Sequence, residues 1–179
     1  MINSYSIIAY INNELDYMMI NKIRYDIFKK FHGESATTLP LHITIIKWKS
    51  YKGVDTAIKI FNKCNLLYLN TKKEIFSNKI EFNIDFMAVW LALSMCYHID
   101  KIANCIKEYA LTLDSFNIVT YKTPHITIAY NDYSKNELNR IYKYIKQETK
   151  ERERFNFKLE NIYLCKHINE KWKVVYTSE

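Results

Sequence analysis

Two copies of one tetrad carry the residue types in this chain that could do chemistry. Residues 42–45 and residues 125–128 both read His-Ile-Thr-Ile, and each tetrad has a proline within two residues upstream, Pro40 and Pro124. Both tetrads lie in apolar runs typical of β-strands. On a strand, alternate residues point to the same face, so each histidine shares a face with its threonine. The pattern therefore predicts two imidazole–hydroxyl pairs presented on strands.

The chemistry that such a pair permits is the cleavage of a phosphodiester. Two imidazoles with pKa values near neutrality can act as general base and general acid, so we expect His42 and His125 to be catalytic. The hydroxyls of Thr44 and Thr127 would donate hydrogen bonds to the non-bridging phosphate oxygens. This chemistry requires no metal or other cofactor, and neither tetrad offers a carboxylate or second histidine at metal-ligand spacing. Either histidine could be the base.

The repetition is more informative than one tetrad alone. The chain has five histidines, so a single His-x-Thr match is unremarkable, but two with identical apolar flanks in separate halves are much rarer. The alternative is a packing or interaction protein whose histidines lie beside strand threonines in a core. That alternative predicts that the two tetrads lie far apart or are buried.

Composition and charge narrow the classes of protein. The chain has 179 residues, is half hydrophobic and a quarter charged, and contains two glycines, which excludes glycine-rich phosphate loops. The net charge of +7 favours an anionic partner. The four cysteines form no CxxC motif, and no signal peptide or long apolar run is present. We therefore expect a cytoplasmic protein, with no membrane contact and no membrane partner.

The periodicity of the apolar residues predicts the elements that must position the tetrads. A strand is expected over 5–11, and a helix after Asn13 with an apolar face of Leu15, Met19, Ile23, Ile27 and Phe31. Further helices are expected over 55–69, around 102–113 and after a capping box of Ser134 and Glu137. Strands are expected over 80–84, 86–93, 155–165 and 172–176. The order strand, helix, histidine strand, helix thus occurs about twice, which predicts an α+β protein of two similar lobes.

The paired His-x-Thr strands, about 80 residues apart, resemble the two-histidine (2H) phosphoesterase superfamily, also called LigT-like. The resemblance covers most of the chain through the order of its elements. It implies a single domain over residues 1–179, with two pseudo-symmetric lobes and two antiparallel β-sheets flanked by helices around a central cleft. It also implies His42 and His125 as the acid–base pair and Thr44 and Thr127 as phosphate binders. Some members place a basic residue just after the second motif, where this chain has Ala129 and Tyr130.

Strand parity extends the prediction to neighbouring residues. Trp48 would share a face with His42, so that its ring could stack on a nucleobase, and Tyr51 would line the rim of the cleft. Lys47 and Tyr130 would point the opposite way, into structural or solvent-facing positions. Trp90, which has apolar neighbours, is expected to pack in the core.

The substrate is predicted from the resemblance and from composition. The chain is rich in Ile, Asn, Lys and Tyr, as in proteins of AT-rich genomes such as those of some large DNA viruses. It resembles the viral members that degrade nucleotide messengers of innate immunity, which would place it in the host cytoplasm. We expect a monomer that cleaves a 2′,5′-linked messenger, with 2′,3′-cGAMP ranked slightly above 2′,5′-oligoadenylate. The alternatives are a cyclic phosphodiesterase acting on RNA ends and a non-catalytic module that sequesters a nucleotide.

Overall fold

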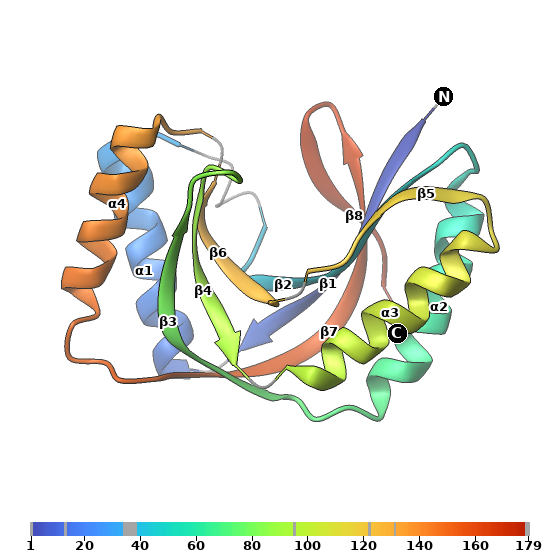
Figure 1. The fold of residues 1–179 in the computed structure, drawn as a ribbon, viewed down its shortest axis with the longest axis horizontal. Helices are drawn as coiled ribbons and strands as arrows, with labels where there is room; N and C mark the ends of the chain where they lie inside the picture. Colours follow the sequence, from blue (N-terminus) through green and yellow to red (C-terminus); the bar gives the residue numbers. More distant parts are fainter. Residues whose placement is uncertain are drawn as a thin grey trace.

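Eight antiparallel strands and four helices make up the fold in the computed structural model, which describes residues 2–12, 14–33, 39–94, 96–121, 123–130 and 132–177 (Figure 1). The predicted α+β class is confirmed. Asn13, expected just before the first helix, lies outside the described residues. The elements are β1 (Asn3–Asn12), α1 (Glu14–Phe31), β2 (His42–Ser50), α2 (Val54–Leu69), β3 (Glu74–Asn83), β4 (Ala88–Ser94), α3 (Tyr97–Leu111), β5 (Ser115–Val119), β6 (His125–Tyr130), α4 (Lys135–Glu148), β7 (Phe155–Ile168) and β8 (Lys171–Thr177).

The strands form one hydrogen-bonded sheet in the order β1-β2-β6-β4-β3-β7-β8, with β5 paired to β2. Strand β7 also pairs with β1, so the sheet returns to its first strand. The beginning of β7 pairs with β3, and its remainder pairs with β1. The two sheets expected from the sequence are thus two halves of one bent sheet, which β7 connects along one side (Figure 1).

Two pairs of helices cover the outer sides of the bent sheet. Helices α1 and α4 lie together beside β3, β4 and β6, whereas α2 and α3 lie together beside β2, β5 and β7 (Figure 1). Helix α1 therefore packs near the strand of the second tetrad, and α3 packs against the strand of the first. Each half of the structure combines segments from both halves of the sequence, and one large cluster of apolar side chains forms most of the core.

The buried face of α1 differs from the prediction. Ile20, Ile23 and Ile27 are buried, and Arg24 lies among them at 6 % exposure. Leu15, predicted to begin the apolar face, is 72 % exposed. The spacing 20, 23, 24, 27 is that of one helical face, so this face includes a charged residue.

The predicted start of α4 is confirmed in detail. The Ser134 hydroxyl accepts a hydrogen bond from the Glu137 backbone N–H at 3.3 Å, and the Glu137 carboxylate accepts one from the Ser134 N–H at 2.8 Å. Strand β5 was not predicted, and residues 84–87, expected to be strand in part, form the turn between β3 and β4. No helix in the described part of the chain has the length and apolar character needed to cross a membrane.

Candidate active site

Pairing between β2 and β6 brings the two tetrads together. Ile43 lies opposite Ile126 in an antiparallel register. The neighbouring positions in that register place His42 beside Thr127 and His125 beside Thr44, with Cβ atoms of opposite residues about 5 Å apart. All four side chains are partly exposed and line one cavity of about 170 Å³. The histidines and threonines are thus close together and partly exposed, whereas the packing alternative required them to be far apart or buried.

The hydrogen bonds of the two imidazoles leave the same ring atom available on each histidine. His42 Nδ1 lies 2.8 Å from the carbonyl oxygen of Pro40, and His125 Nδ1 lies 3.1 Å from that of Thr123. A carbonyl oxygen only accepts, so Nδ1 must carry the proton in both bonds. In the neutral rings Nε2 then keeps its lone pair and is the atom available for proton transfer.

A β-bulge lies at the last residue of each tetrad. On β2, Ile46 pairs with Ile7 and Thr44 pairs with Ile8, so Ile45 is an extra residue. On β6, Ala129 pairs with Val89 and Thr127 pairs with Trp90, which leaves Ile128 as the extra residue. An extra residue reverses the alternation of faces along the rest of the strand. The last residue of each tetrad therefore changes which later side chains face the cavity.

The bulge on β2 overturns the expected orientation of Trp48. Its side chain is fully buried and stacks on Tyr5 in the core, with ring centroids 5.6 Å apart. Trp48 cannot contact a ligand in the cavity. Tyr51 is 67 % exposed, stacks on Phe116 and does not line the cavity.

The same bulges bring Lys47 and Tyr130 into the cavity lining, where the sequence placed neither. Each lies five residues after the histidine of its tetrad, so the two positions correspond. Lys47 is half-buried, and its ammonium group lies 5.0 Å from the centre of the Trp172 ring. The signal in the sequence is the pair of consecutive apolar residues after each threonine, Ile45–Ile46 and Ile128–Ala129, which breaks strict alternation.

Aromatic rings surround His125. The Trp90 ring stacks on its imidazole at 4.3 Å between centroids, and Tyr121 contacts it edge-on at 4.8 Å. Trp90 was expected to pack in the core. It is only 9 % exposed, but its side chain also lines the cavity. Its indole Nε1–H donates a hydrogen bond of 3.0 Å to the carboxylate of Glu81. Trp90 is therefore held by Glu81 and in turn limits the orientations available to His125.

The electrostatic surroundings of the two imidazoles differ. The pKa of His42 is lowered to about 4, chiefly by burial; the hydrogen bond to Pro40 opposes this change, and the charges of Arg24 and His125 add to it. Burial also lowers the pKa of His125, but the Thr123 carbonyl and the negative charge of Glu81 oppose this change. A cation lies near His42 and a carboxylate near His125.

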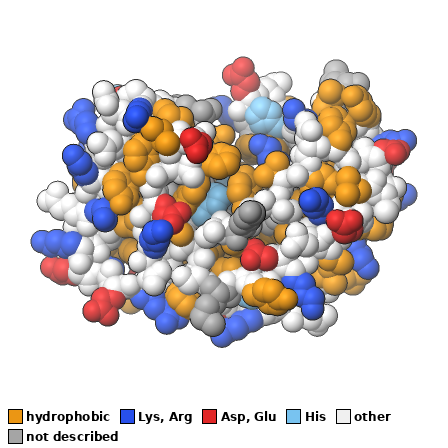
Figure 2. All heavy atoms as spheres, in the orientation of Figure 1, with side chains coloured by type: hydrophobic (Ala, Val, Ile, Leu, Met, Phe, Trp, Pro, Cys, Tyr) orange, Lys and Arg blue, Asp and Glu red, His pale blue; other side chains and the backbone are white. Residues whose placement is uncertain are grey.

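The cavity walls also differ in character. Arg24 lines it close to His42, and Lys47 lines it five residues farther along β2. Trp90 and Tyr121 contact His125, and Phe86 lies against Trp90. In the space-filling view, histidine atoms lie near the centre of the face shown, between hydrophobic side chains (Figure 2). The arrangement suits a ligand with a phosphate beside the cations and a nucleobase beside the rings.

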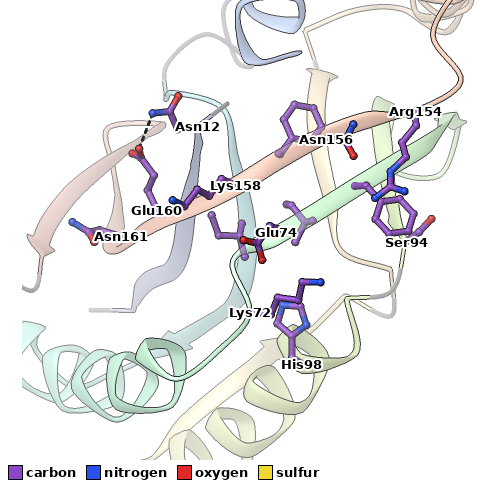
Figure 3. A pocket seen from close by; sticks show the side chains of 14 residues that line it. Asn12, Lys72, Glu74, Ser94, His98, Arg154, Asn156, Lys158, Glu160 and Asn161 are labelled. Atoms are coloured by element: carbon purple, nitrogen blue, oxygen red, sulfur yellow. Dashed lines mark hydrogen bonds between the residues drawn. The ribbon is translucent and has the colours of Figure 1, made fainter. Parts of the chain in front are cut away.

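A second, larger hollow of about 970 Å³ lies along β3 and β7 and shares no lining residue with the cavity of the tetrads. Its side chains include Lys72, His98 and Arg154 together with Glu74 and Glu160 (Figure 3). Cations and carboxylates are mixed in this hollow, and none of the His-x-Thr residues reaches it. Across the described residues, no group of three or more His, Cys, Asp or Glu side chains is arranged to hold a metal ion.

The fold is that of a known structure. Escherichia coli LigT, in a crystal structure complexed with 3′-AMP, superposes with a TM-score of 0.52 and 12 % sequence identity over 99 % of this chain and 95 % of that chain. Usb1 of Kluyveromyces marxianus gives a TM-score of 0.47 with 9 % identity over 96 % of this chain and 97 % of that chain. Neither a protein-family model nor a curated protein matches the sequence.

Proposed function

We propose that this chain is a metal-independent phosphodiesterase of the 2H phosphoesterase superfamily that acts on a nucleotide substrate. The observation that carries the proposal is the pairing of β2 with β6, which places two histidines with available Nε2 atoms and two threonine hydroxyls around one cavity. The fold, which is that of LigT, agrees with the family that the tetrads resemble.

The different surroundings of the histidines support an assignment of roles. His42, close to Arg24, stays neutral and acts as general base: its Nε2 takes the proton of the attacking ribose hydroxyl or water. The attacking oxygen forms a bond to phosphorus as the bond to the leaving 5′ oxygen breaks. His125 is the general acid and donates its Nε2 proton to that oxygen, because Glu81 and the bound phosphate both favour its charged form. Thr44 and Thr127 donate hydrogen bonds to the non-bridging oxygens.

The finer proposal concerns the substrate. A cavity of about 170 Å³ has room for a phosphate and part of a sugar, and it is smaller than complete sites for drug-sized ligands, which measure about 300–1,000 Å³. The remainder of a dinucleotide would extend along the open cleft. The aromatic side around Trp90 supports binding of a nucleobase. Within this frame we propose 2′,5′-linked messengers, 2′,3′-cGAMP slightly ahead of 2′,5′-oligoadenylate, as the substrates.

Cleavage of a panel of nucleotides in the presence of EDTA tests the proposal. The panel contains 2′,3′-cGAMP, 3′,3′-cyclic dinucleotides, 2′,5′-oligoadenylate and RNA ending in a 2′,3′-cyclic phosphate, with products separated by chromatography. We expect His42→Ala and His125→Ala each to lower the rate about 10²- to 10⁴-fold. His32→Asn is the matched control, because His32 is exposed and its positive φ of 61° suits asparagine.

Each outcome of the panel has a distinct meaning. Loss of cleavage in both cleft variants but not in His32→Asn supports the mechanism, and the substrate cleaved fastest identifies the specificity. Preference for the cyclic-phosphate RNA would replace the messenger proposal with RNA-end processing. Tight binding without turnover would indicate a sequestering module and refute the catalytic proposal.

A further inference from the structure

Arg24 is a buried cation at the cavity of the tetrads. It extends from α1 among Ile20, Ile23 and Ile27, and it is 6 % exposed although it lines the cavity together with His42. Charged side chains are rarely this buried without a partner of opposite charge. Its position therefore calls for an explanation beyond packing.

The hydrogen bonds of Arg24 go to neutral groups. Nη2 donates to the carbonyl oxygen of Leu39 at 3.0 Å, and Nη1 donates to the Asn21 side chain at 3.3 Å. The Nε atom is buried and has no hydrogen-bond partner within the described part of the protein. A guanidinium has five N–H donors, so these two bonds leave most of its capacity unused.

The acidic side chains described on α1 are engaged elsewhere. Asp16 forms an ion pair with Arg152 at 3.4 Å, and Asp26 accepts a hydrogen bond from Tyr144 at 3.3 Å. Among the described residues, no carboxylate forms an ion pair with Arg24. Burial lowers the pKa of Arg24 to about 10, so the side chain still carries its charge at neutral pH. The cavity thus contains a positive charge that nothing in the described structure neutralises.

We propose that Arg24 is the phosphate-binding cation of the cleft, and that its guanidinium holds the phosphate of a nucleotide beside His42. The assignment rests on the proposed function, and it supplies a phosphate-binding cation in a chain that has Ala129 and Tyr130 where some 2H members place a basic residue. Guanidinium is well suited to this role because its planar donors match the geometry of phosphate oxygens. Lys47, five residues farther along β2 than His42, is a second cation in the lining of the same cavity.

Isothermal titration calorimetry with adenosine 5′-monophosphate and with adenosine tests the assignment without requiring turnover. We expect Arg24→Gln to weaken binding of the monophosphate about 10- to 100-fold, because hydrogen bonds to charged groups are the strongest class, and to leave binding of adenosine unchanged. Arg24→Lys keeps the charge but loses the planar donors, so an intermediate loss is expected. Lys22→Gln, an exposed charge removal on the same helix, is the matched control and should bind as the wild type does.

A purely structural role gives a different result. If Arg24 only anchors Leu39 ahead of the histidine strand, Arg24→Gln lowers the melting temperature while the folded variant binds the monophosphate with wild-type affinity, which overturns the assignment. If Arg24→Gln does not fold, Arg24→Lys decides: wild-type affinity for the monophosphate overturns the proposal, and a loss confined to the monophosphate supports it. Absence of monophosphate binding by the wild type also overturns it. Arg24-dependent binding without cleavage of any substrate would retain this site and refute only the catalytic proposal.

Discussion

His42 and His125 differ in the charged side chains that lie nearest to them, Arg24 for the first and Glu81 for the second. This difference supports the assignment of base and acid, which the repeated tetrad alone left open. It also makes the assignment testable, because a change in one charge should move the titration of only one histidine.

Glu81→Gln removes the carboxylate that raises the pKa of His125. If His125 is the general acid, the variant loses the required proton at a lower pH. We therefore expect the alkaline limb of the profile of kcat/KM against pH to move to lower pH. Lys79→Gln, which removes the exposed partner of Glu81, serves as the control. If the acidic limb shifts instead, His125 is the general base and His42 the general acid.

Trp90→Leu removes the ring that stacks on His125 at 4.3 Å. Stacked pairs contribute about 0.5–1.5 kcal/mol beyond area burial, so a loss of kcat of roughly 2- to 10-fold is expected. Trp90→Phe keeps a ring but not the donor to Glu81, and should lose less. Steady-state kinetics separate this effect from simple loss of substrate affinity. An unchanged kcat in folded Trp90→Leu would argue against a positioning role.

The bulges are the elements that decide which side chains reach the cavity. Strict alternation along β2 would point Trp48 into the cavity. Because of the bulge, Lys47 lines the cavity and Trp48 is buried in the core. We expect Lys47→Gln to raise KM about 10-fold by loss of a charged contact to phosphate. Lys49→Gln, an exposed lysine on the same strand that does not line the cavity, should leave KM unchanged. Equal effects of both substitutions would indicate only a general influence of net charge.

The capping box of α4 offers a test of stability that is separate from the site. Ser134→Ala removes the hydroxyl that accepts from the Glu137 N–H. Loss of an N-cap costs about 1 kcal/mol. Urea denaturation should show this decrease in the free energy of unfolding, with activity unchanged. A loss of activity in the folded variant would show that α4 supports the cleft more directly than its position suggests.

The elements themselves were largely predictable because their signals are local. The apolar periodicity, the capping box and the tetrads each specify structure within a few residues, and they located the helices and most strands. The bulges were not predicted because the two apolar residues after each threonine show only that alternation breaks there. The register that makes the break a bulge depends on the pairing of β2 with β1 and of β6 with β4, which are distant in sequence. Arg24 does not follow from a helical face that begins at Leu15, whereas the spacing of Ile20, Ile23 and Ile27 places residue 24 at a buried position.

At the scale of the whole molecule, the partly buried imidazoles couple stability to pH. The pKa of His42 is about 4 in the folded protein, below the value of about 6.5 expected in the unfolded chain. Between these values the unfolded chain binds more protons, so the free energy of unfolding should fall as the pH drops from about 6.5 to about 4. At about 1.36 kcal/mol per unit the upper limit is roughly 3 kcal/mol, and less for this partly exposed side chain. The direction is the same for His125.

Urea denaturation at about pH 7 and pH 5 measures this coupling. His42→Gln, which cannot titrate, should lose less stability between the two pH values than the wild type does. Equal losses in both proteins would show that His42 does not titrate below its usual range. Comparison of the two proteins cancels the contribution of the carboxylates, which is common to both.

The overall arrangement of the chain was less predictable than its elements. The order of strands and helices indicated two similar lobes, but α1 packs beside β6 and α3 beside β2, so the lobes do not follow the two halves of the sequence. Periodicity shows which face of a helix is buried and does not show which sheet covers it. The path of β7 across both halves likewise depends on partners far apart in the chain.

The long strand β7 has a consequence for how the protein folds. Strands β1 and β7 pair although they lie near opposite ends of the sequence, as Tyr5 with Lys166. This pairing joins the two ends of the strand series β1-β2-β6-β4-β3-β7, which includes both tetrad strands. Contacts of such separation give a high contact order, which is associated with folding in milliseconds to seconds. On the ribosome, both histidines would leave the exit tunnel before the strand that closes the sheet. The cleft would therefore be completed only after synthesis of its two histidines has ended.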